Sequence, residues 1–303
     1  MIVNMKNELI DAKKKGYAIP QFNVNNLEWA KYILKTCNLY RSPVIMGFTE
    51  SAIEYMGGYH TASGLIYDLV HDLHITVPVS IHLDHGTSVL SCKKAIDASF
   101  TSVMLDASLK RIDTNIDMTN EVIEYARGKR VIVESKIGSI GKHDEGDTKN
   151  ASVTGSIIFV KKTKVDLLAP AVGNVHGIYK EFPNINVKLI KEISENTDLP
   201  LVLHGASGIN NKTLRECIKN GICKVNINTD LQVAWAKEVR KLLETDSSVY
   251  DPRKIISSGE KAVVKVIKEK YKYQTISFDK VNMLRHILFF KDIDGVKAHM
   301  DKH

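Results

Sequence analysis

The feature that most constrains the fold of this chain is a regular alternation of short apolar runs with longer amphipathic stretches. The short runs are rich in β-branched residues and have the length of buried strands. Strands that alternate with helices are typical of a parallel sheet built from strand–helix–strand units. The predicted strands are Ala18–Asn23, Val44–Phe48, Val77–Leu83, Ser102–Asp106, Val131–Ser135, Leu167–Val172, Leu201–His204 and Lys224–Ile227.

The number of these units decides between two kinds of parallel sheet. A chain of 303 residues could hold two domains, but one α/β barrel of roughly 250 residues also fits. Eight strands favour a closed (β/α)8 barrel over an open doubly wound sheet. The sequence therefore predicts an α/β fold, a TIM barrel over residues 1–270. The predicted helices are Leu27–Leu39, Thr61–Asp72, Ser91–Ala98, Ile116–Arg127, Lys188–Glu195, Asn211–Asn220, Leu231–Leu243 and Gly259–Lys270.

Two regions fit this alternation less well. Gly138–Ser156 is long, polar and glycine-bearing, and a loop of that length in a compact domain is usually functional or mobile. Residues 271–303 continue past the point where a barrel should be closed. The apolar patch Ile287–Phe290 predicts that this C-terminal helical extension packs on the barrel or at a subunit interface.

Composition narrows the class of partner and the compartment. The 42 Lys+Arg exceed the 35 Asp+Glu, but most of the surplus lies from Arg253 onward. The basic residues form no glycine–aromatic RNA-binding motif, and no apolar run approaches the ~20 residues of a membrane span. We therefore expect neither a nucleic-acid partner nor a membrane. The 4 cysteines are widely spaced and no signal peptide is visible, which predicts reduced thiols and a cytoplasmic protein.

Three histidines stand at or just after the ends of predicted strands, and a glycine follows each one. They are His85, His176 and His204. In a (β/α)8 barrel the carboxyl ends of the strands form the active-site face, so all three should point towards one mouth. Three neutral imidazoles with one open position are the arrangement of a catalytic zinc site. The alternative is three separate histidines, each hydrogen-bonded to its own loop. His82 is expected as a hydrogen-bond donor behind the site.

Carboxylates lie close to these histidines in the sequence. Asp84 directly precedes His85, and Asp106 ends the next predicted strand. A carboxylate beside a Lewis-acidic metal indicates proton transfer at the reacting centre. Asp106 could equally cap a helix, and the sequence leaves both roles open.

Two further segments have the composition of phosphate sites. Gly205–Gly208 follows the seventh predicted strand, and Asn226–Thr229 closes the eighth and opens a helix. Small residues let backbone N–H groups approach a phosphate at a helix N-terminus. Phosphate sites after strands seven and eight are frequent in this fold, so the sequence predicts a phosphorylated substrate.

With these residues in view, the chain resembles the class II, metal-dependent ketose-bisphosphate aldolases over about residues 1–270. The resemblance is specific because its motifs occur in order along the chain. They are Gln21–Asn23, Ser42–Ile45, Tyr55–Gly58, Ile81–Gly86, Ser102–Ser108, Val175–Lys180, Leu203–Ile209, Lys224–Thr229 and Asp251–Lys254.

The resemblance implies a role for each matching residue. His85, His176 and His204 would bind one catalytic zinc ion, and a monovalent cation is left open as a second cofactor. Asp84 would give a proton to the aldehyde oxygen in condensation and take the C4 hydroxyl proton in cleavage. Arg253 would reach a second phosphate, with a neighbouring subunit as one possible site of action. The full set of implied substrate-binding residues is Asn23, Thr49, Gly177, Lys180, Gly205, Ala206, Ser207, Asn226, Asn228, Thr229 and Arg253.

The implied reaction is reversible cleavage of a ketose 1,6-bisphosphate, first of all fructose 1,6-bisphosphate. The products are dihydroxyacetone phosphate and an aldehyde such as glyceraldehyde 3-phosphate. Zinc would stabilise the enediolate, so that no Schiff-base lysine is needed. The alternatives are a tagatose-bisphosphate aldolase, an inositol-catabolic keto-deoxy phosphosugar aldolase, or a catalytically impaired phosphosugar-binding paralogue. The family also implies a homodimer or homotetramer.

The chain departs from the family pattern at two places that bear on catalysis. Lys136 stands where the family carries a glutamate of an auxiliary metal position, which it shares with the aspartate that matches Asp106. We expect the Lys136 charge to replace that second ion. The family's loop glutamate falls on Asp144 in direct register, whereas a shift by one residue would supply Glu145.

Overall fold

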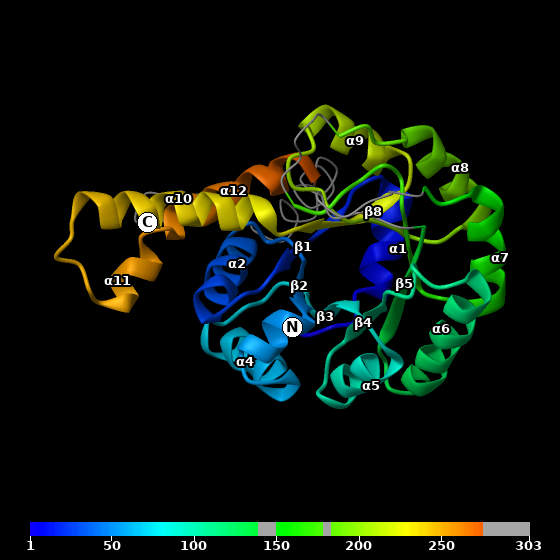
Figure 1. The fold of residues 1–303 in the computed structure, drawn as a ribbon, viewed down its shortest axis with the longest axis horizontal. Helices are drawn as coiled ribbons and strands as arrows, with labels where there is room; N and C mark the ends of the chain where they lie inside the picture. The colour runs from blue at the N-terminus through cyan, green and yellow to red at the C-terminus, as the bar shows by residue number, and fades with distance from the viewer. Residues whose placement is uncertain (139–149, 178–182, 275–303) are drawn as a thin grey trace, which may run out of the picture.

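The computed structural model describes residues 1–138, 150–177 and 183–274, and its strands close into a parallel barrel (Figure 1). Each strand pairs with the next along the chain, and β8 pairs with β1. The predicted (β/α)8 TIM barrel is confirmed. The strands are β1 (Ile19–Asn23), β2 (Val44–Thr49), β3 (Val79–Gly86), β4 (Ser102–Leu105), β5 (Ile132–Ile137), β6 (Leu167–Pro170), β7 (Leu201–Leu203) and β8 (Ile222–Ile227).

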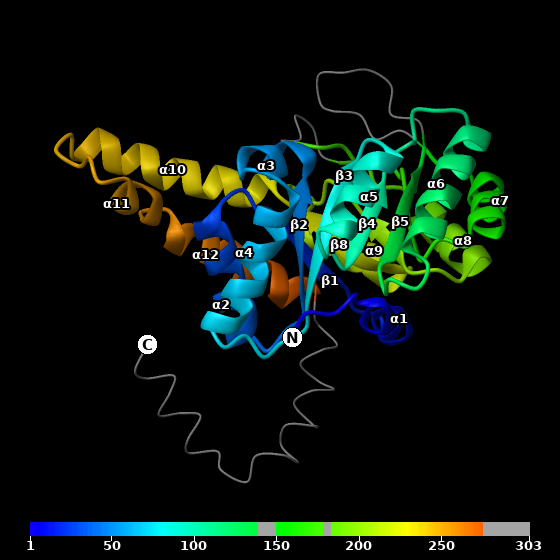
Figure 2. The same ribbon diagram turned by 90° about the horizontal axis from the view of Figure 1, so that it is seen from below.

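The helices form a ring around the barrel, apart from α1 at one end and α10 and α11, which extend sideways from it (Figures 1 and 2). They are α1 (Lys6–Lys15), α2 (Leu27–Leu39), α3 (Glu50–Tyr55), α4 (Tyr59–Asp72), α5 (Val89–Asp97), α6 (Ile112–Ala126), α7 (Val153–Thr163), α8 (Val187–Thr197), α9 (Asn211–Lys219), α10 (Thr229–Thr245), α11 (Pro252–Ser257) and α12 (Glu260–Gln274).

Local sequence signals explain where several of these helices begin. Asn26 caps α2 by accepting from the Trp29 amide, and Asn210 caps α9 by accepting from the Thr213 amide, both at 2.9 Å. Such caps satisfy amide groups that the first helical turn leaves without partners. The caps fix the exits from the βα loops, which lie on the face that carries the site.

The interior of the barrel is divided into an apolar end and a polar end. At the end of the barrel that α1 covers, Ile19, Ile45, Met104 and Val202 are buried in one cluster with Leu9 of α1. Figure 2 shows α1 lying across this end. A second and larger cluster fills the space between the outside of the barrel and the helices. The side chains that line the cavity at the carboxyl ends of the strands are mostly polar, among them Asn23, Asp84 and His204.

Two sequence expectations need correction at their edges. The predicted loop Gly138–Ser156 is too long, because α7 begins at Val153. Its cap, Ser152, accepts from the Gly155 amide at 3.0 Å, a signal that the polar composition of the segment concealed.

The predicted boundary at residue 270 falls inside α12. Tyr271 is buried against Phe22, with ring centroids 6.0 Å apart, and donates to the Pro43 carbonyl. Residues 275–303, most of the predicted extension, lie outside the described residues.

Two expectations about chain chemistry can be compared with the structure. All 4 cysteines are buried as free thiols, as their spacing predicted. Of the helices in the part of the chain that the structure describes, none is both long and apolar enough to cross a membrane.

Candidate active site

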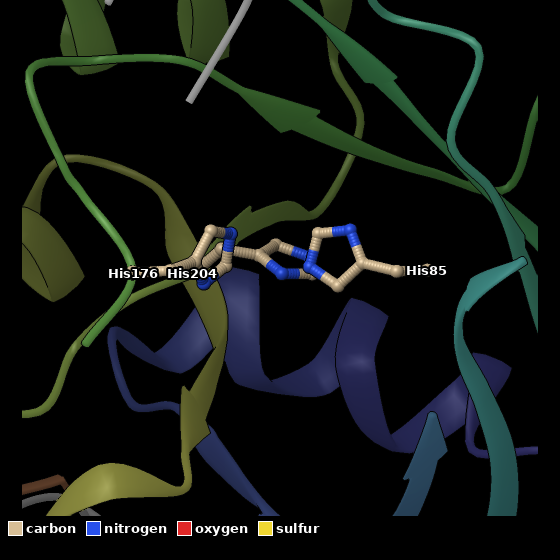
Figure 3. Close-up of side chains that lie close together, drawn as sticks. All are labelled: His85, His176 and His204. Carbon is tan, nitrogen blue, oxygen red and sulfur yellow. The ribbon is translucent and has the colours of Figure 1, made fainter. Parts of the chain in front are cut away.

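Three histidine side chains from separate strand ends meet at the mouth of the barrel. His85 belongs to β3, whereas His176 and His204 follow β6 and β7. Their ring centroids lie 4.6 to 5.8 Å apart, and one candidate ligand atom of each lies within 4.8 Å of the others. Figure 3 shows the rings converging, with His85 opposite the other two. The structure therefore brings together the three histidines that the strand ends had predicted to meet.

A break in the pairing of β3 places both Asp84 and His85 in the site. Adjacent residues of a regular strand point to opposite faces, yet both of these line the same cavity. The register with β4 shifts between Leu83 and Gly86, and His85 has a left-handed backbone with φ of 56°. Bulges of this kind re-aim side chains next to active sites. Gly86 is required because a Cβ there would lie 2.6 Å from the Met104 carbonyl oxygen.

The ring nitrogens of the three histidines are suited to hold a metal ion. His85 Nδ1 contacts Asp106 Oδ2 at 2.6 Å, and His204 Nε2 contacts Glu134 Oε1 at 2.8 Å. Buried Nε2 atoms of His85 and His176 have no hydrogen-bond partner. Burial lowers the pKa of His176 to about 2 and also lowers the pKa of His204. Neutral rings with free lone pairs are what zinc requires, so the residues fit the metal.

Asp84 lies beside this centre as a buried carboxylate. Its Oδ2 accepts from Asn23 Nδ2 at 2.8 Å, and its Oδ1 lies 3.4 Å from Asn226 Nδ2. Burial alone would raise the pKa of Asp84, but the neighbouring imidazoles, His85 and His204 foremost, outweigh burial and lower it. Two amide donors also favour the ionised form. Asp84 is thus held as an oriented, ionised carboxylate whose Oδ1 lies 4.0 Å from His85 Nε2.

Residues of the predicted phosphate site line the same cavity as the histidines and Asp84. Gly205 has φ of 61°, and a Cβ there would collide with the Val175 carbonyl, so only glycine fits this turn. Thr229 begins α10, whose N-terminus opens towards the cavity and favours anions. The lining consists of Asn23, Thr49, Asp84, His85, His176, Gly177, His204, Gly205, Ser207, Asn226, Asn228 and Thr229.

Two of the other predicted site residues, Ala206 and Arg253, do not line this cavity. Ala206 is fully buried, and its amide donates to the Asn226 carbonyl at 3.2 Å, so it shapes the turn. The Arg253 side chain is 89% exposed on α11 and pairs with Asp251. Asp144, Glu145 and Lys180 lie outside the described residues.

Behind the histidines lies a set of charged residues whose role the sequence interpretation missed. Glu134 and Lys224 are 0% and 1% exposed, and their charged groups are 2.5 Å apart. Burial opposes ionisation of Glu134, but the Lys224 ammonium outweighs it and lowers the pKa of the carboxyl. A signal was present: Glu134 and Lys136 are two positions apart in β5, a strand that is buried throughout. That pattern places one polar face of the strand inside the barrel.

Comparison with known proteins agrees with this geometry. The family model Fructose-bisphosphate aldolase class-II matches residues 3–277. The chain belongs to this family. Fructose-bisphosphate aldolases of Staphylococcus epidermidis and Staphylococcus aureus are 44% and 45% identical to it over 278 and 280 residues, which is 89% of this chain and 96% of theirs. The class II aldolase resemblance is therefore confirmed, and with it an aldehyde-lyase family.

Two further aldolases are similar to this chain. A 6-phospho-5-dehydro-2-deoxy-D-gluconate aldolase of Bacillus subtilis is 44% identical over 271 residues, or 88% of this chain and 93% of its own. Among solved structures, the YdjI aldolase of Escherichia coli K12 has a TM-score of 0.80 at 29% identity. That match covers 91% of this chain and 98% of the YdjI chain.

Proposed function

We propose that this family member is a zinc-dependent aldolase that reversibly cleaves a ketose 1,6-bisphosphate, first of all fructose 1,6-bisphosphate. The products would be dihydroxyacetone phosphate and an aldehyde such as glyceraldehyde 3-phosphate. The observation that carries the proposal is the lining of one cavity. Three histidines, two of them with an unpaired Nε2, a buried carboxylate and the turn of a phosphate site all line the same space.

Each part of this cavity has a chemical task in the cleavage. Zinc held by His85, His176 and His204 would polarise the ketose carbonyl and stabilise the negative charge that develops when C3–C4 breaks. Asp84, oriented by Asn23 and Asn226, takes the proton from the C4 hydroxyl. The lowered pKa keeps Asp84 ionised, which is the form that can accept a proton.

The substrate is bound from two sides in this proposal. Gly177, Gly205, Ser207 and the segment 226–229 hold the phosphate of the dihydroxyacetone half, since small residues and the start of α10 leave amide groups accessible. Thr49 contacts the other half of the sugar. Lys180 is proposed as a further phosphate contact, and Asp144 or Glu145 as the loop residue that exchanges a proton with dihydroxyacetone phosphate.

Arg253 remains the proposed contact for the second phosphate. Its exposure on α11, away from the barrel in Figure 1, favours action in the site of a second copy of the chain. A homodimer or homotetramer and a bound monovalent cation stay predictions, and so does the cytoplasmic location expected from the sequence.

We also propose that each chain holds one zinc ion. The Lys136 ammonium lies 2.9 Å from Asp106 Oδ2, so a cation of the protein already neutralises that carboxylate. Metal analysis of the purified protein should give one zinc per chain. Two zinc ions per chain would contradict the role given to Lys136.

Sequence identity does not choose between the bisphosphate and the deoxy sugar acid, because relatives of both kinds are equally similar. The test is cleavage of four substrates by zinc-loaded protein and by chelator-treated protein. The panel contains fructose 1,6-bisphosphate, tagatose 1,6-bisphosphate, 6-phospho-5-dehydro-2-deoxy-D-gluconate and the monophosphate fructose 1-phosphate.

We expect the highest kcat/KM on fructose 1,6-bisphosphate, and loss of cleavage with chelator. A higher kcat/KM on 6-phospho-5-dehydro-2-deoxy-D-gluconate would make that sugar acid the preferred substrate and would leave the proposed zinc-dependent mechanism unchanged. No cleavage of any member of the panel by zinc-loaded protein would favour the phosphosugar-binding paralogue.

A further inference from the structure

A buried ion pair lies in the middle of the barrel, one layer below the proposed metal site. Glu134 of β5 and Lys224 of β8 are almost fully buried, and so is His82 of β3. None of the three lines the cavity that we assign to the substrate. A buried ion pair usually adds little net stability compared with apolar residues of similar volume. Stability alone therefore does not account for this pair.

The hydrogen-bond directions around the pair are fixed because the Lys224 ammonium group can donate hydrogen bonds but cannot accept them. Lys224 Nζ donates to Glu134 Oε2, 2.5 Å away, and to His82 Nε2, 3.2 Å away. His82 therefore carries its proton on Nδ1, which faces Ser102 Oγ at 2.7 Å. Lys224 contacts only Oε2 of Glu134, so the other carboxylate oxygen, Oε1, is left to accept a hydrogen bond from another group.

That oxygen, Glu134 Oε1, lies 2.8 Å from His204 Nε2. A carboxylate accepts and does not donate, so His204 must hold its proton on Nε2. The lone pair of His204 is then on Nδ1, which accepts from Asn226 Nδ2 at 3.2 Å and lies 3.9 Å from Asp84 Oδ1; His204 itself lines the cavity. The pair thus selects which nitrogen of His204 is offered to a metal.

His85 shows the same device with the opposite nitrogen. Its Nδ1 meets Asp106 at 2.6 Å, and Asp106 is held by Lys136 at 2.9 Å. The free nitrogen of His85 is therefore Nε2. Two carboxylates, each paired with a lysine, therefore fix the protonated nitrogen of two of the three rings. Asp106 acts on His85 and Glu134 acts on His204.

We infer that Glu134 and Lys224 are positioning residues that fix the tautomer and orientation of His204 and so strengthen metal binding. The inference rests on the proposed metal site. Carboxylate partners of metal-bound histidines typically change metal affinity 10- to 100-fold when they are replaced. We expect an effect of this size, although neither residue touches metal or substrate.

Two double variants of similar volume separate positioning from packing. Glu134→Gln with Lys224→Met removes both charges but keeps an acceptor for His204. Glu134→Leu with Lys224→Met removes the acceptor as well. The apolar-layer variant Ile45→Ala is the control, because Ile45 is buried at the other end of the barrel. Zinc affinity is measured by competition with a chromophoric chelator, and the geometry of the site by the visible absorption of bound Co²⁺.

The Leu–Met variant should bind zinc about 100-fold more weakly and the Gln–Met variant about 10-fold more weakly, with Co²⁺ absorption reduced most in the former. Ile45→Ala should lose stability but keep wild-type zinc affinity. Wild-type zinc affinity in both folded double variants would overturn the inference and leave the proposed function intact. Failure of the wild-type protein to bind zinc would instead remove the proposed function.

A measurement on the wild-type chain tests the same claim without any variant of the pair. The ¹H–¹⁵N correlations of the imidazole rings in chelator-treated protein report which nitrogen carries the proton. Variants His204→Gln and His85→Gln assign the signals. We expect the proton on Nε2 of His204 and on Nδ1 of His85. A proton on Nδ1 of His204 would overturn the inference.

Discussion

The two ends of the barrel interior are built from the same strands but from different chemistry. At the amino end, Ile19, Ile45 and Met104 pack against Leu9 of α1 in an apolar cluster. At the carboxyl end, β1, β2 and β3 present Asn23, Thr49 and Asp84, and Asp106 directly follows β4. The first end is closed by a helix and the second opens into the cavity.

This difference means that the two ends of the barrel are expected to contribute to different properties, the closed end to stability and the open end to chemistry. Apolar side chains at the closed end gain free energy by leaving water and need no specific partner. Charged groups at and below the open end lose hydration and must be paired or hydrogen-bonded, as Glu134 and Lys224 are in the layer below the site. The closed end should therefore control unfolding, and the open end should control metal binding and turnover.

The largest effect is expected at the open end from Asp84→Asn. Asparagine keeps the shape of the side chain but cannot take a proton from the substrate. Turnover should fall by about 10² to 10⁴, while zinc content stays at the wild-type value. Steady-state kinetics and metal analysis of the same preparation check this. Turnover within tenfold of the wild type would remove Asp84 from its proposed role.

The corresponding variant at the closed end is Leu9→Ala. Leu9 is fully buried, and its truncation should lower the free energy of unfolding by about 2–5 kcal/mol. Zinc affinity and turnover of the folded protein should not change. Lys14→Ala, at an exposed position of the same helix, is the control and should shift stability by less than about 0.5 kcal/mol. Weaker zinc binding in Leu9→Ala would show that the two ends are coupled.

The open end should also make stability depend on pH. Burial, together with the Lys224 ammonium, lowers the pKa of His82 from 6.5 to about 3. Below pH 6.5 the unfolded chain therefore binds a proton that the folded chain does not, and stability falls as the pH falls. The loss from His82 approaches about 1.4 kcal/mol per pH unit.

Urea unfolding of chelator-treated protein at pH 7.5, 6.5 and 5.5 measures this loss. The variant His82→Asn should show a shallower decrease. Equal decreases in the variant and the wild type would contradict the assignment of a neutral His82.

The smallest effect is expected at Thr49, where structure and function meet in one side chain. Thr49 Oγ1 accepts from the Ala52 amide at the start of α3 and also lines the cavity. Thr49→Val should cost about 1 kcal/mol of stability through the lost cap and raise KM. Thr49→Ser keeps the hydroxyl and should restore both values. A raised KM in Thr49→Ser would show that the methyl group matters as well.

Much of the fold and the centre of the site could be predicted from the sequence. The strands have apolar cores and end in glycine-bearing turns, so the positions of His85, His176 and His204 follow from the direction of parallel strands. The family assignment rests on ordered motifs and agrees with the comparisons. The start of α7 was hidden because its cap, Ser152, lies in a polar stretch that resembles a loop.

What could not be predicted depends on contacts between strands that are distant in the sequence. The register shift after Leu83, which turns Asp84 and His85 towards one cavity, is a property of the pairing between β3 and β4. The bond from Glu134 to Lys224 joins residues 90 positions apart. Strand patterns show that such residues face inward, but not which inward residue meets which.

The most direct test of the account is a zinc titration of chelator-treated protein, with cleavage of fructose 1,6-bisphosphate as the readout. The account predicts no cleavage at the start and a linear rise that ends at one zinc ion per chain. A variant with His176→Ala should show no rise over the same range. Full cleavage without zinc, or a rise that continues to two ions per chain, would contradict it.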